Sequence, residues 1–158
     1  MEKLLKLIED NARLSLEELA SMLGKSEAEV AGLLDQAQKN GVIKGFRTLI
    51  DWTRTDVNHV EALIELRVSP KKNRGFDEIA QTIASFDEVE SVNLMSGGFD
   101  LMLVIRGKTF QEVALFVARR LSPLDDVLST ATHFVLRTYK REGKPFLTDD
   151  VDLREYTV

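Results

Sequence analysis

The stretch 25-KSEAEVAGLLDQAQKNGVIKG-45 has the pattern of a capped helix that ends in a glycine-containing turn. Ser26 can cap this helix, and Glu29, three residues further on, completes a capping box. Apolar residues then recur at spacings of three and four until an Asn-Gly pair ends the pattern. The helical part nevertheless carries Glu27, Glu29 and Asp35 and almost no positive charge. The stretch therefore has the shape of a DNA-reading element without its usual charge.

Two shorter helices are expected before this stretch. The segment 15-SLEELASMLG-24 begins with Ser15, has Glu18 at the capping-box position and ends with a glycine. An apolar stripe within residues 1–10 predicts the first helix. The second and third helices would be joined by only a few residues, which is the tight joint that a helix-turn-helix needs. We expect residues 42–51 to form a small β-hairpin, or wing, followed by a strand.

The second half of the chain changes character. Strands are predicted for residues 59–69, 89–96, 101–107 and 127–141, and helices for residues 75–86 and 110–121. This β-α-β-β-α-β order is the ferredoxin-like pattern, in which helices cover one face of a four-stranded sheet. The strands carry apolar residues on both faces, so we expect a partner to cover the bare face, and a homodimer is the simplest arrangement.

We therefore predict an α+β fold, with an N-terminal winged helix-turn-helix and a C-terminal ferredoxin-like βαββαβ domain. The expected segments are a helix-turn-helix domain at residues 1–50, a linker at 51–58, the βαββαβ domain at 59–143 and a tail at 144–158.

Composition limits the classes of function. The net charge is −5 and the pI is about 5.1, whereas nucleic-acid-binding proteins are usually basic. Residues 1–50 hold seven basic and eight acidic side chains, so one such domain should bind DNA weakly. There is no cysteine, which excludes disulfides and thiolate metal sites. The N-terminus is charged and no apolar run approaches the roughly 20 residues of a membrane span, so we expect a cytoplasmic protein with no membrane partner.

Nothing in the sequence predicts an enzyme. His59 and His133 lie in predicted strands without metal-ligand spacing, and we interpret each as a half-buried strand residue. No Gly-x-Ser-x-Gly motif is present. We therefore expect no catalytic residues, no metal and no cofactor.

The chain resembles the Lrp/AsnC, or feast/famine, transcriptional regulators over nearly its whole length. The similar segments are 13-RLSLEELASMLGKS-26, 41-GVIKGF-46 and 96-SGGFDLML-103. The resemblance implies a winged helix-turn-helix, a βαββαβ effector domain and dimers that form through the sheets and assemble into octamers or larger. It also implies binding to double-stranded DNA and a response to an amino acid held between dimers.

Two departures from the family pattern stand out. The middle of the recognition helix, usually Arg or Lys in the family, is Gly32, Leu33, Asp35 and Gln36 here. The loop that is often Gly-Asp-aromatic-Asp reads Gly97-Gly98-Phe99-Asp100, so one carboxylate is missing.

Two sets of site residues follow from these patterns. The candidate DNA contacts are Lys25, Gln36, Lys39, Lys44 and Arg47. The candidate effector site is Ser96, Gly97, Gly98, Phe99 and Asp100. Glycines would let a ligand approach the backbone, whose N–H groups could hold a carboxylate, while Asp100 receives an ammonium group or orients the loop. The alternative interpretation of this segment is a simple β-turn.

The predicted function is a sequence-specific DNA-binding transcriptional regulator that responds to an amino acid or a related small metabolite. Its expected partners are double-stranded DNA, a small-molecule amino acid and further copies of itself, as a homodimer that builds an octamer. The alternative is a ligand-sensing oligomer without DNA binding of its own, which co-assembles with a DNA-binding relative. Binding to DNA distinguishes the two.

Overall fold

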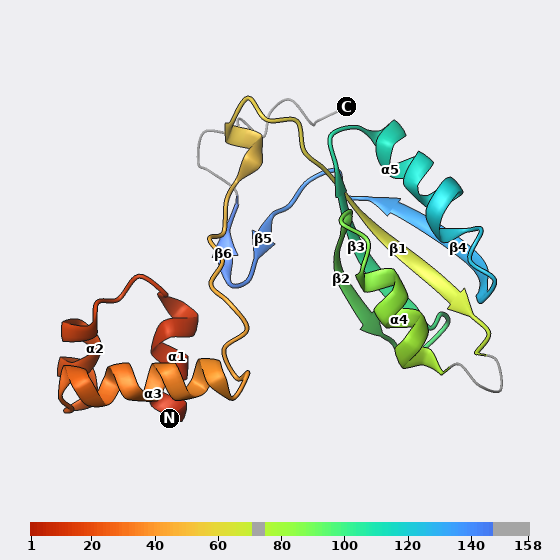
Figure 1. The fold of residues 1–158 in the computed structure, drawn as a ribbon. Helices are drawn as coiled ribbons and strands as arrows, with labels where there is room; N and C mark the ends of the chain where they lie inside the picture. Colours follow the sequence, from red (N-terminus) through yellow and green to blue (C-terminus); the bar gives the residue numbers. More distant parts are fainter. Residues whose placement is uncertain (71–74, 147–158) are drawn as a thin grey trace. The chain divides into compact units, whose positions relative to one another are not determined.

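Three helices make up the N-terminal part of the computed structural model, which describes residues 1–70 and 75–146. They are α1 (Glu2–Asp10), α2 (Leu16–Leu23) and α3 (Glu27–Lys39) (Figure 1). The chain divides into two units, Met1–Ile50 and Asp51–Val158, and each is described here by itself. In the described residues no helix is long and apolar enough to cross a membrane.

Both predicted capping boxes are confirmed. The Ser15 N–H donates to Glu18 Oε2 at 2.7 Å, and the Glu18 N–H donates to Ser15 Oγ at 3.1 Å. Ser26 and Glu29 repeat the arrangement at the start of α3. The helices pack around Leu4, Leu19, Ala20 and Val30, whose buried side chains form the core of this unit. Local sequence signals thus fix where α2 and α3 begin.

A left-handed glycine makes the joint between α2 and α3 short. Gly24 has φ 62° and ψ 40°, and its N–H donates to the carbonyl of Ala20. The Lys25 N–H donates to the same carbonyl at 3.0 Å. These bonds use the free carbonyls at the end of α2 and turn the chain directly into the cap of α3.

The predicted hairpin at residues 42–51 is wrong, because residues 43–51 form no strand. The N–H groups of Val42 and Ile43 donate to the carbonyl of Ala37 at 2.9 and 3.1 Å, so they close the end of α3. The side chains of Val42, Phe46 and Ile50 are exposed. A β-hairpin needs two strands that pair, and no backbone hydrogen bond joins the apolar pair Val42-Ile43 to the apolar pair Leu49-Ile50 in the described residues.

The second unit contains the predicted βαββαβ order. Its strands are β1 (Val60–Val68), β2 (Val89–Leu94), β3 (Leu101–Gly107) and β4 (Val127–Phe134), in the antiparallel order β2-β3-β1-β4. Its helices are α4 (Phe76–Ala84) and α5 (Phe110–Phe116), and α5 continues as a π-helical turn, Val117–Leu121. A short 3-10 turn, Trp52–Arg54, precedes β1. The ferredoxin-like prediction is confirmed.

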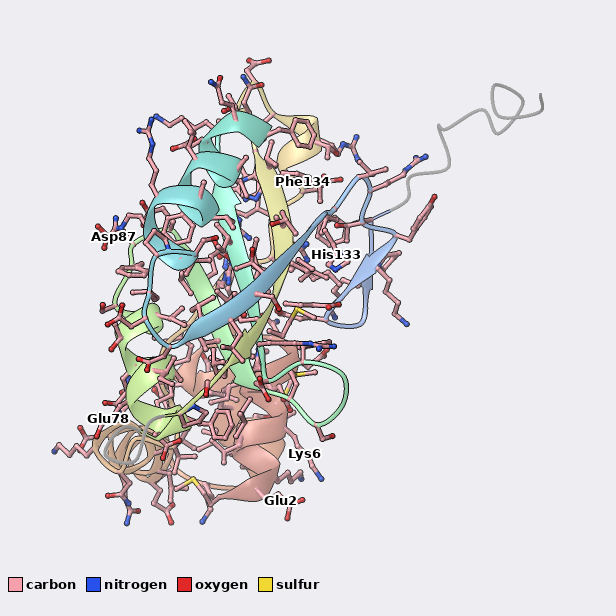
Figure 2. All side chains as sticks on the ribbon, turned by 90° about the vertical axis from the view of Figure 1, so that its right-hand side faces the viewer. Glu2, Lys6, Glu78, Asp87, His133 and Phe134 are labelled. Carbon is pink, nitrogen blue, oxygen red and sulfur yellow. The ribbon has the colours of Figure 1, made fainter. Side chains whose placement is uncertain are left out.

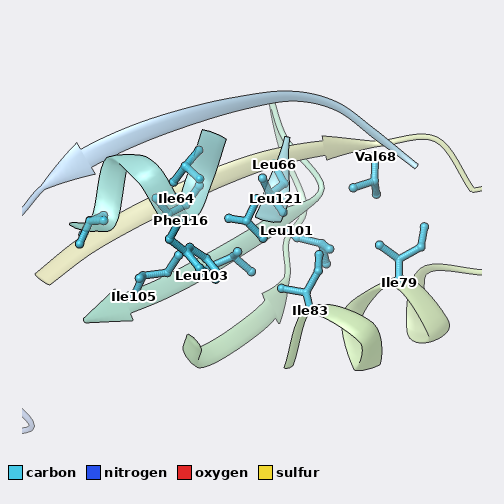
Figure 3. Close-up of a cluster of buried hydrophobic side chains, with 13 residues drawn as sticks. Ile64, Leu66, Val68, Ile79, Ile83, Leu101, Leu103, Ile105, Phe116 and Leu121 are labelled. Atoms are coloured by element: carbon cyan, nitrogen blue, oxygen red, sulfur yellow. The ribbon is translucent and has the colours of Figure 1, made fainter. Parts of the chain in front are cut away.

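Alternation along the strands places the core on one face of the sheet. Ala62, Ile64 and Leu66 of β1 and Leu101 and Leu103 of β3 are fully buried. The buried side chains of α4 and α5 pack on this face, as Figure 3 shows. His133 and Phe134 lie on opposite sides of β4, and Phe134 packs edge-on against Phe110 of α5 (Figure 2).

The opposite face of the sheet has no helix over it in the described residues. Leu63 of β1 lies directly across from Val104 of β3, and both are half-buried. Met102 is half-buried on the same face. We call this surface the open face.

The last strand is shorter than predicted. β4 ends at Phe134 rather than at residue 141, and a small hairpin follows, β5 (Lys140–Arg141) with β6 (Lys144–Pro145). Its turn residues Glu142 and Gly143 have φ 46° and 78°, as a tight two-residue turn requires. The predicted tail therefore begins inside this hairpin, and residues 147–158 lie outside the described residues.

Two glycines with open space around them should respond to alanine in opposite ways. An added Cβ meets nothing within 4 Å at Gly24 or at Gly32. Gly24 has a left-handed backbone, so Gly24→Ala should lower the free energy of unfolding by about 1 kcal/mol or more. Gly32 lies inside α3, so Gly32→Ala should raise it by roughly 0.5–1 kcal/mol. Urea denaturation followed by circular dichroism measures both, and shifts of the same sign would contradict this account.

Candidate DNA interface and ligand loop

Helix α3 presents a distinct exposed face. Val30 and Ala37 are buried against the other helices. On the opposite side of the helix from these two residues, the exposed positions are Ala28, Gly32, Asp35 and Lys39, and Gln36 is exposed next to them. These positions follow each other at spacings of three and four, so they share the outer surface of the helix.

Two of the predicted DNA contacts are engaged in ion pairs on α3. Lys39 Nζ lies 2.7 Å from Asp35 Oδ2, and Lys25 Nζ lies 3.7 Å from Glu29 Oε1. The pKa of Glu29 lies below its usual value, mainly because the backbone N–H and the hydroxyl of Ser26 bind its carboxylate, with Lys25 adding a smaller effect. The helix cap thus keeps Glu29 charged. Each of the two lysines is therefore balanced by an acid.

The other predicted DNA contacts follow α3. Lys44 folds back, so that its Nζ lies 3.0 Å from where a Cβ on Gly41 would stand. This places its charge beside the C-terminus of α3, where the helix dipole favours a cation. Arg47 is exposed in the irregular segment after it. All five candidates lie in the first unit, and none of their side chains is buried.

The predicted ligand loop, Ser96 to Asp100, joins β2 to β3. It is closed by the Met95 N–H, which donates to the Asp100 carbonyl at 2.8 Å. The Asp100 N–H donates to Leu66 O at 2.9 Å, and Asp100 Oδ2 accepts from the Val68 N–H at 2.8 Å. Asp100 therefore fastens the loop to the end of β1, which agrees with the orienting role rather than with a free carboxylate.

The rest of the loop offers unused backbone donors. Ser96, Gly97 and Gly98 are exposed, and Phe99 is half-buried. Among the described residues, the N–H groups of residues 96–99 meet no acceptor. Gly97 has φ 142°, and an added Cβ at Gly98 meets nothing within 4 Å. A cluster of free N–H groups beside two adjacent glycines suits a carboxylate.

A charged network on the open face was not predicted. Arg106 bonds to Glu90 and lies 3.4 Å from Glu61. Arg141 of the terminal hairpin lies 2.6 Å from the other oxygen of Glu61. Glu61 and Arg106 become neighbours only through the β1–β3 register. No spacing in the sequence could show this pairing.

The prediction that each histidine is a half-buried strand residue is only partly right: His59 is half-buried but precedes β1, and His133 lies in β4 but is exposed. His59 is half-buried and stacks on Trp52, with 5.8 Å between ring centroids. Its pKa lies below the usual value because of burial and, second, the nearby Arg106. His133 Nε2 lies 3.2 Å from Glu65 Oε1 on the open face.

The two units together define a class of protein. A helix-turn-helix with a tightly joined exposed helix is a DNA-binding unit. In the same chain it is followed by a ferredoxin-like domain with an open sheet face and a glycine loop. This combination is a DNA-binding unit joined to a ligand-binding domain.

Comparison with known proteins identifies the family. The model of the Lrp/AsnC ligand binding domain matches residues 61–145, and a winged helix-turn-helix DNA-binding model matches residues 2–44. The chain belongs to the Lrp/AsnC family. It is 46% identical over 153 residues to YugG of Bacillus subtilis, named an HTH-type transcriptional regulator, and the match covers 96% of this chain and 92% of that one.

More distant relatives share the same organisation. The proline dehydrogenase transcriptional activator of Rhodobacter capsulatus is 26% identical over 137 residues, or 87% of this chain and 88% of that one. A transcriptional regulator of Neisseria meningitidis, solved as a complex with L-methionine, superposes with a TM-score of 0.71 at 22% identity, covering 88% of this chain and 89% of that one. Escherichia coli AsnC superposes with a TM-score of 0.67 at 20% identity, covering 87% of this chain and 91% of that one. The structural likenesses support the fold.

Asp100 should be important for stability as well as for the loop. Asp100→Ala leaves the Val68 N–H without its acceptor, so the free energy of unfolding should fall by about 1–3 kcal/mol. Asp100→Asn keeps an acceptor oxygen, so its free energy of unfolding should fall by clearly less. Urea denaturation of both variants measures the difference. Equal losses for the two variants would contradict the Val68 contact.

Proposed function

We propose that this protein is a sequence-specific DNA-binding transcriptional regulator whose DNA affinity changes when an amino acid binds at the loop of residues 96–100. The observation that carries the proposal is the helix-turn-helix, with its short Gly24 joint and exposed α3, in one chain with a Lrp/AsnC ligand-binding domain.

DNA contact is assigned to α3 and the residues around it. Gln36 and Lys39 would reach base edges, because amide and ammonium groups supply the donors that major-groove readout uses. Lys25, Lys44 and Arg47 would contact phosphates. Lys25 and Lys39 already pair with acids of α3, so a single unit should bind DNA weakly.

Assembly supplies the missing affinity in this proposal. The half-buried apolar residues Leu63, Met102 and Val104 on the open face suit a second copy of the chain, which forms a homodimer through the two sheets. Further association of dimers, with an octamer as the expected assembly, places several helix-turn-helix units on one DNA. Linked binding of this kind can add about 10²- to 10⁴-fold to the affinity of one unit.

The effector is assigned to the amino acids. The free N–H groups of residues 96–99 suit a carboxylate, and the exposed Met95 beside them suits an apolar side chain. The L-methionine bound to the Neisseria meningitidis regulator supports this class of ligand. No cofactor is part of the proposal.

A second candidate function is a ligand-sensing oligomer that does not bind DNA itself. The observation that favours it is the charge of residues 1–50, with eight acids against seven bases. Such a protein would act by co-assembly with a DNA-binding relative.

Fluorescence anisotropy separates the two functions. The full chain is titrated into the duplex upstream of its own gene and into a random duplex, each at two salt concentrations. A regulator binds its own upstream DNA more tightly, and added salt weakens binding because phosphate contacts release counterions. No binding to either duplex at low salt would contradict the regulator and support the second candidate.

The same titration, repeated with L-methionine, L-leucine and L-phenylalanine, tests the loop. An effector shifts the affinity of the natural protein for its own DNA, and Gly98→Ala should abolish that shift because the added methyl blocks close approach to the backbone. The methyl meets nothing in the protein, so thermal stability and ligand-free DNA binding should be unchanged. A full response in this variant would place the ligand elsewhere.

A further inference from the structure

The exposed face of α3 carries an acid where contact with DNA would favour a base. Asp35 lies on the same outer surface as Lys39, and their charged atoms are 2.7 Å apart. Both side chains are well exposed, at 59% for Asp35 and 74% for Lys39. An exposed pair of this kind adds little to stability, so folding alone gives a weak reason for an acid at this position.

Asp35 and Lys39 have opposite hydrogen-bonding capacities. An ionised carboxylate only accepts hydrogen bonds, and an ammonium group only donates them. The ion pair holds one acceptor and one donor side by side at the helix surface.

A C·G base pair shows the complementary pattern in the major groove. Cytosine presents the N4 amino group, which is a donor, and guanine presents O6 and N7, which are acceptors. N4 and O6 are neighbours because they hydrogen-bond to each other within the pair. An A·T pair also has two acceptors, but adenine N7 and thymine O4 lie on opposite sides of the N6 donor and the thymine methyl lies beyond O4. An ammonium group beside the carboxylate therefore meets one acceptor where guanine offers two.

We propose that the Asp35–Lys39 pair reads one C·G base pair in each half-site of the operator. Asp35 accepts from cytosine N4, and Lys39 donates to guanine O6 or N7. The inference rests on the proposed function, in which α3 enters the major groove.

Asp35 also lowers the affinity of the protein for random DNA. The carboxylate of Asp35 holds Lys39 and repels phosphate, so non-specific contact is weakened. The lost binding free energy is regained only where a cytosine amino group donates to the carboxylate. Asp35 is thus a specificity-determining residue rather than a source of affinity.

The chain contains a matched control for this pair. On α1, Lys6 Nζ lies 2.7 Å from Glu2 Oε1, with the same i,i+4 spacing, and Figure 2 shows the two residues on that helix. Glu2→Gln removes one negative charge and frees one lysine, as Asp35→Asn does, but on α1 rather than on α3.

The first test is selection of bound duplexes from a randomised pool, using the full-length natural protein, Asp35→Asn and Glu2→Gln. The natural protein and Glu2→Gln should enrich the same sites, with one C·G pair in each half-site. With Asp35→Asn, the enrichment of C·G at that position should fall by a factor of about five or more, while the other selected positions stay the same. Circular dichroism checks that each variant folds.

The second test measures binding to a random duplex at several salt concentrations. Asp35→Asn frees Lys39 for phosphate, so binding should tighten and the slope of log K against log salt should steepen by up to about 0.9 for each subunit in contact. Glu2→Gln should change the slope by much less. The same slope change in both variants would overturn the proposal.

The outcomes separate the inference from the proposed function. If the natural protein selects a site and Asp35→Asn selects the same site with an unchanged C·G preference, the inference is wrong and the regulator stands. If the natural protein selects no sequence and binds no duplex at low salt, the proposed function falls and the inference falls with it.

Discussion

The bare face of the β2-β3-β1-β4 sheet is the constraint on which the rest of the molecule depends. Both helices of the second unit pack on the other face, so Leu63 and Val104, which are half-buried, meet across the open face with no helix above them in the described residues. Covering these side chains with a second copy would remove apolar surface from water, which is the main favourable term in most protein association. The partly buried charges of Glu61, Arg106 and Arg141 border this surface and would restrict how a second copy fits.

In the proposed function, assembly compensates for the small positive charge of the helix-turn-helix. The requirements of a stable helix and of a DNA-binding helix differ at the start of α3. Glu29 closes the capping box and satisfies backbone donors of the first turn, but it also pairs with Lys25 and repels phosphate. A single domain with these features gains little from the DNA backbone. Under the proposal, several domains held by one oligomer would need only weak contacts each, and the polar groups of Gln36 and of the Asp35–Lys39 pair would provide the discrimination.

Much of the fold is predictable from the sequence because its signals are local. The caps at Ser15 and Ser26 and the apolar periodicity determine the helices, and the alternating strands determine the βαββαβ order. The predictions fail where pairing partners decide the structure: residues 42–51 find no strand to pair with, and the last strand stops at Phe134 where a hairpin begins. The loop at residues 96–100 is predictable as a glycine-rich turn. The bond from the Val68 N–H to Asp100 depends on tertiary structure and could not be predicted.

The most direct test of this account joins assembly to DNA binding. Leu63→Asp places a charge on the open face, and Leu115→Asp, on the outer side of α5, is the matched control. Analytical ultracentrifugation gives the mass of each variant, and anisotropy gives its affinity for the upstream duplex. The account predicts that Leu63→Asp falls to the 17.8 kDa monomer and binds DNA about 100-fold more weakly, whereas Leu115→Asp keeps the mass and affinity of the natural dimer or larger assembly. A monomeric Leu63→Asp that binds the duplex as tightly as the natural protein would contradict it.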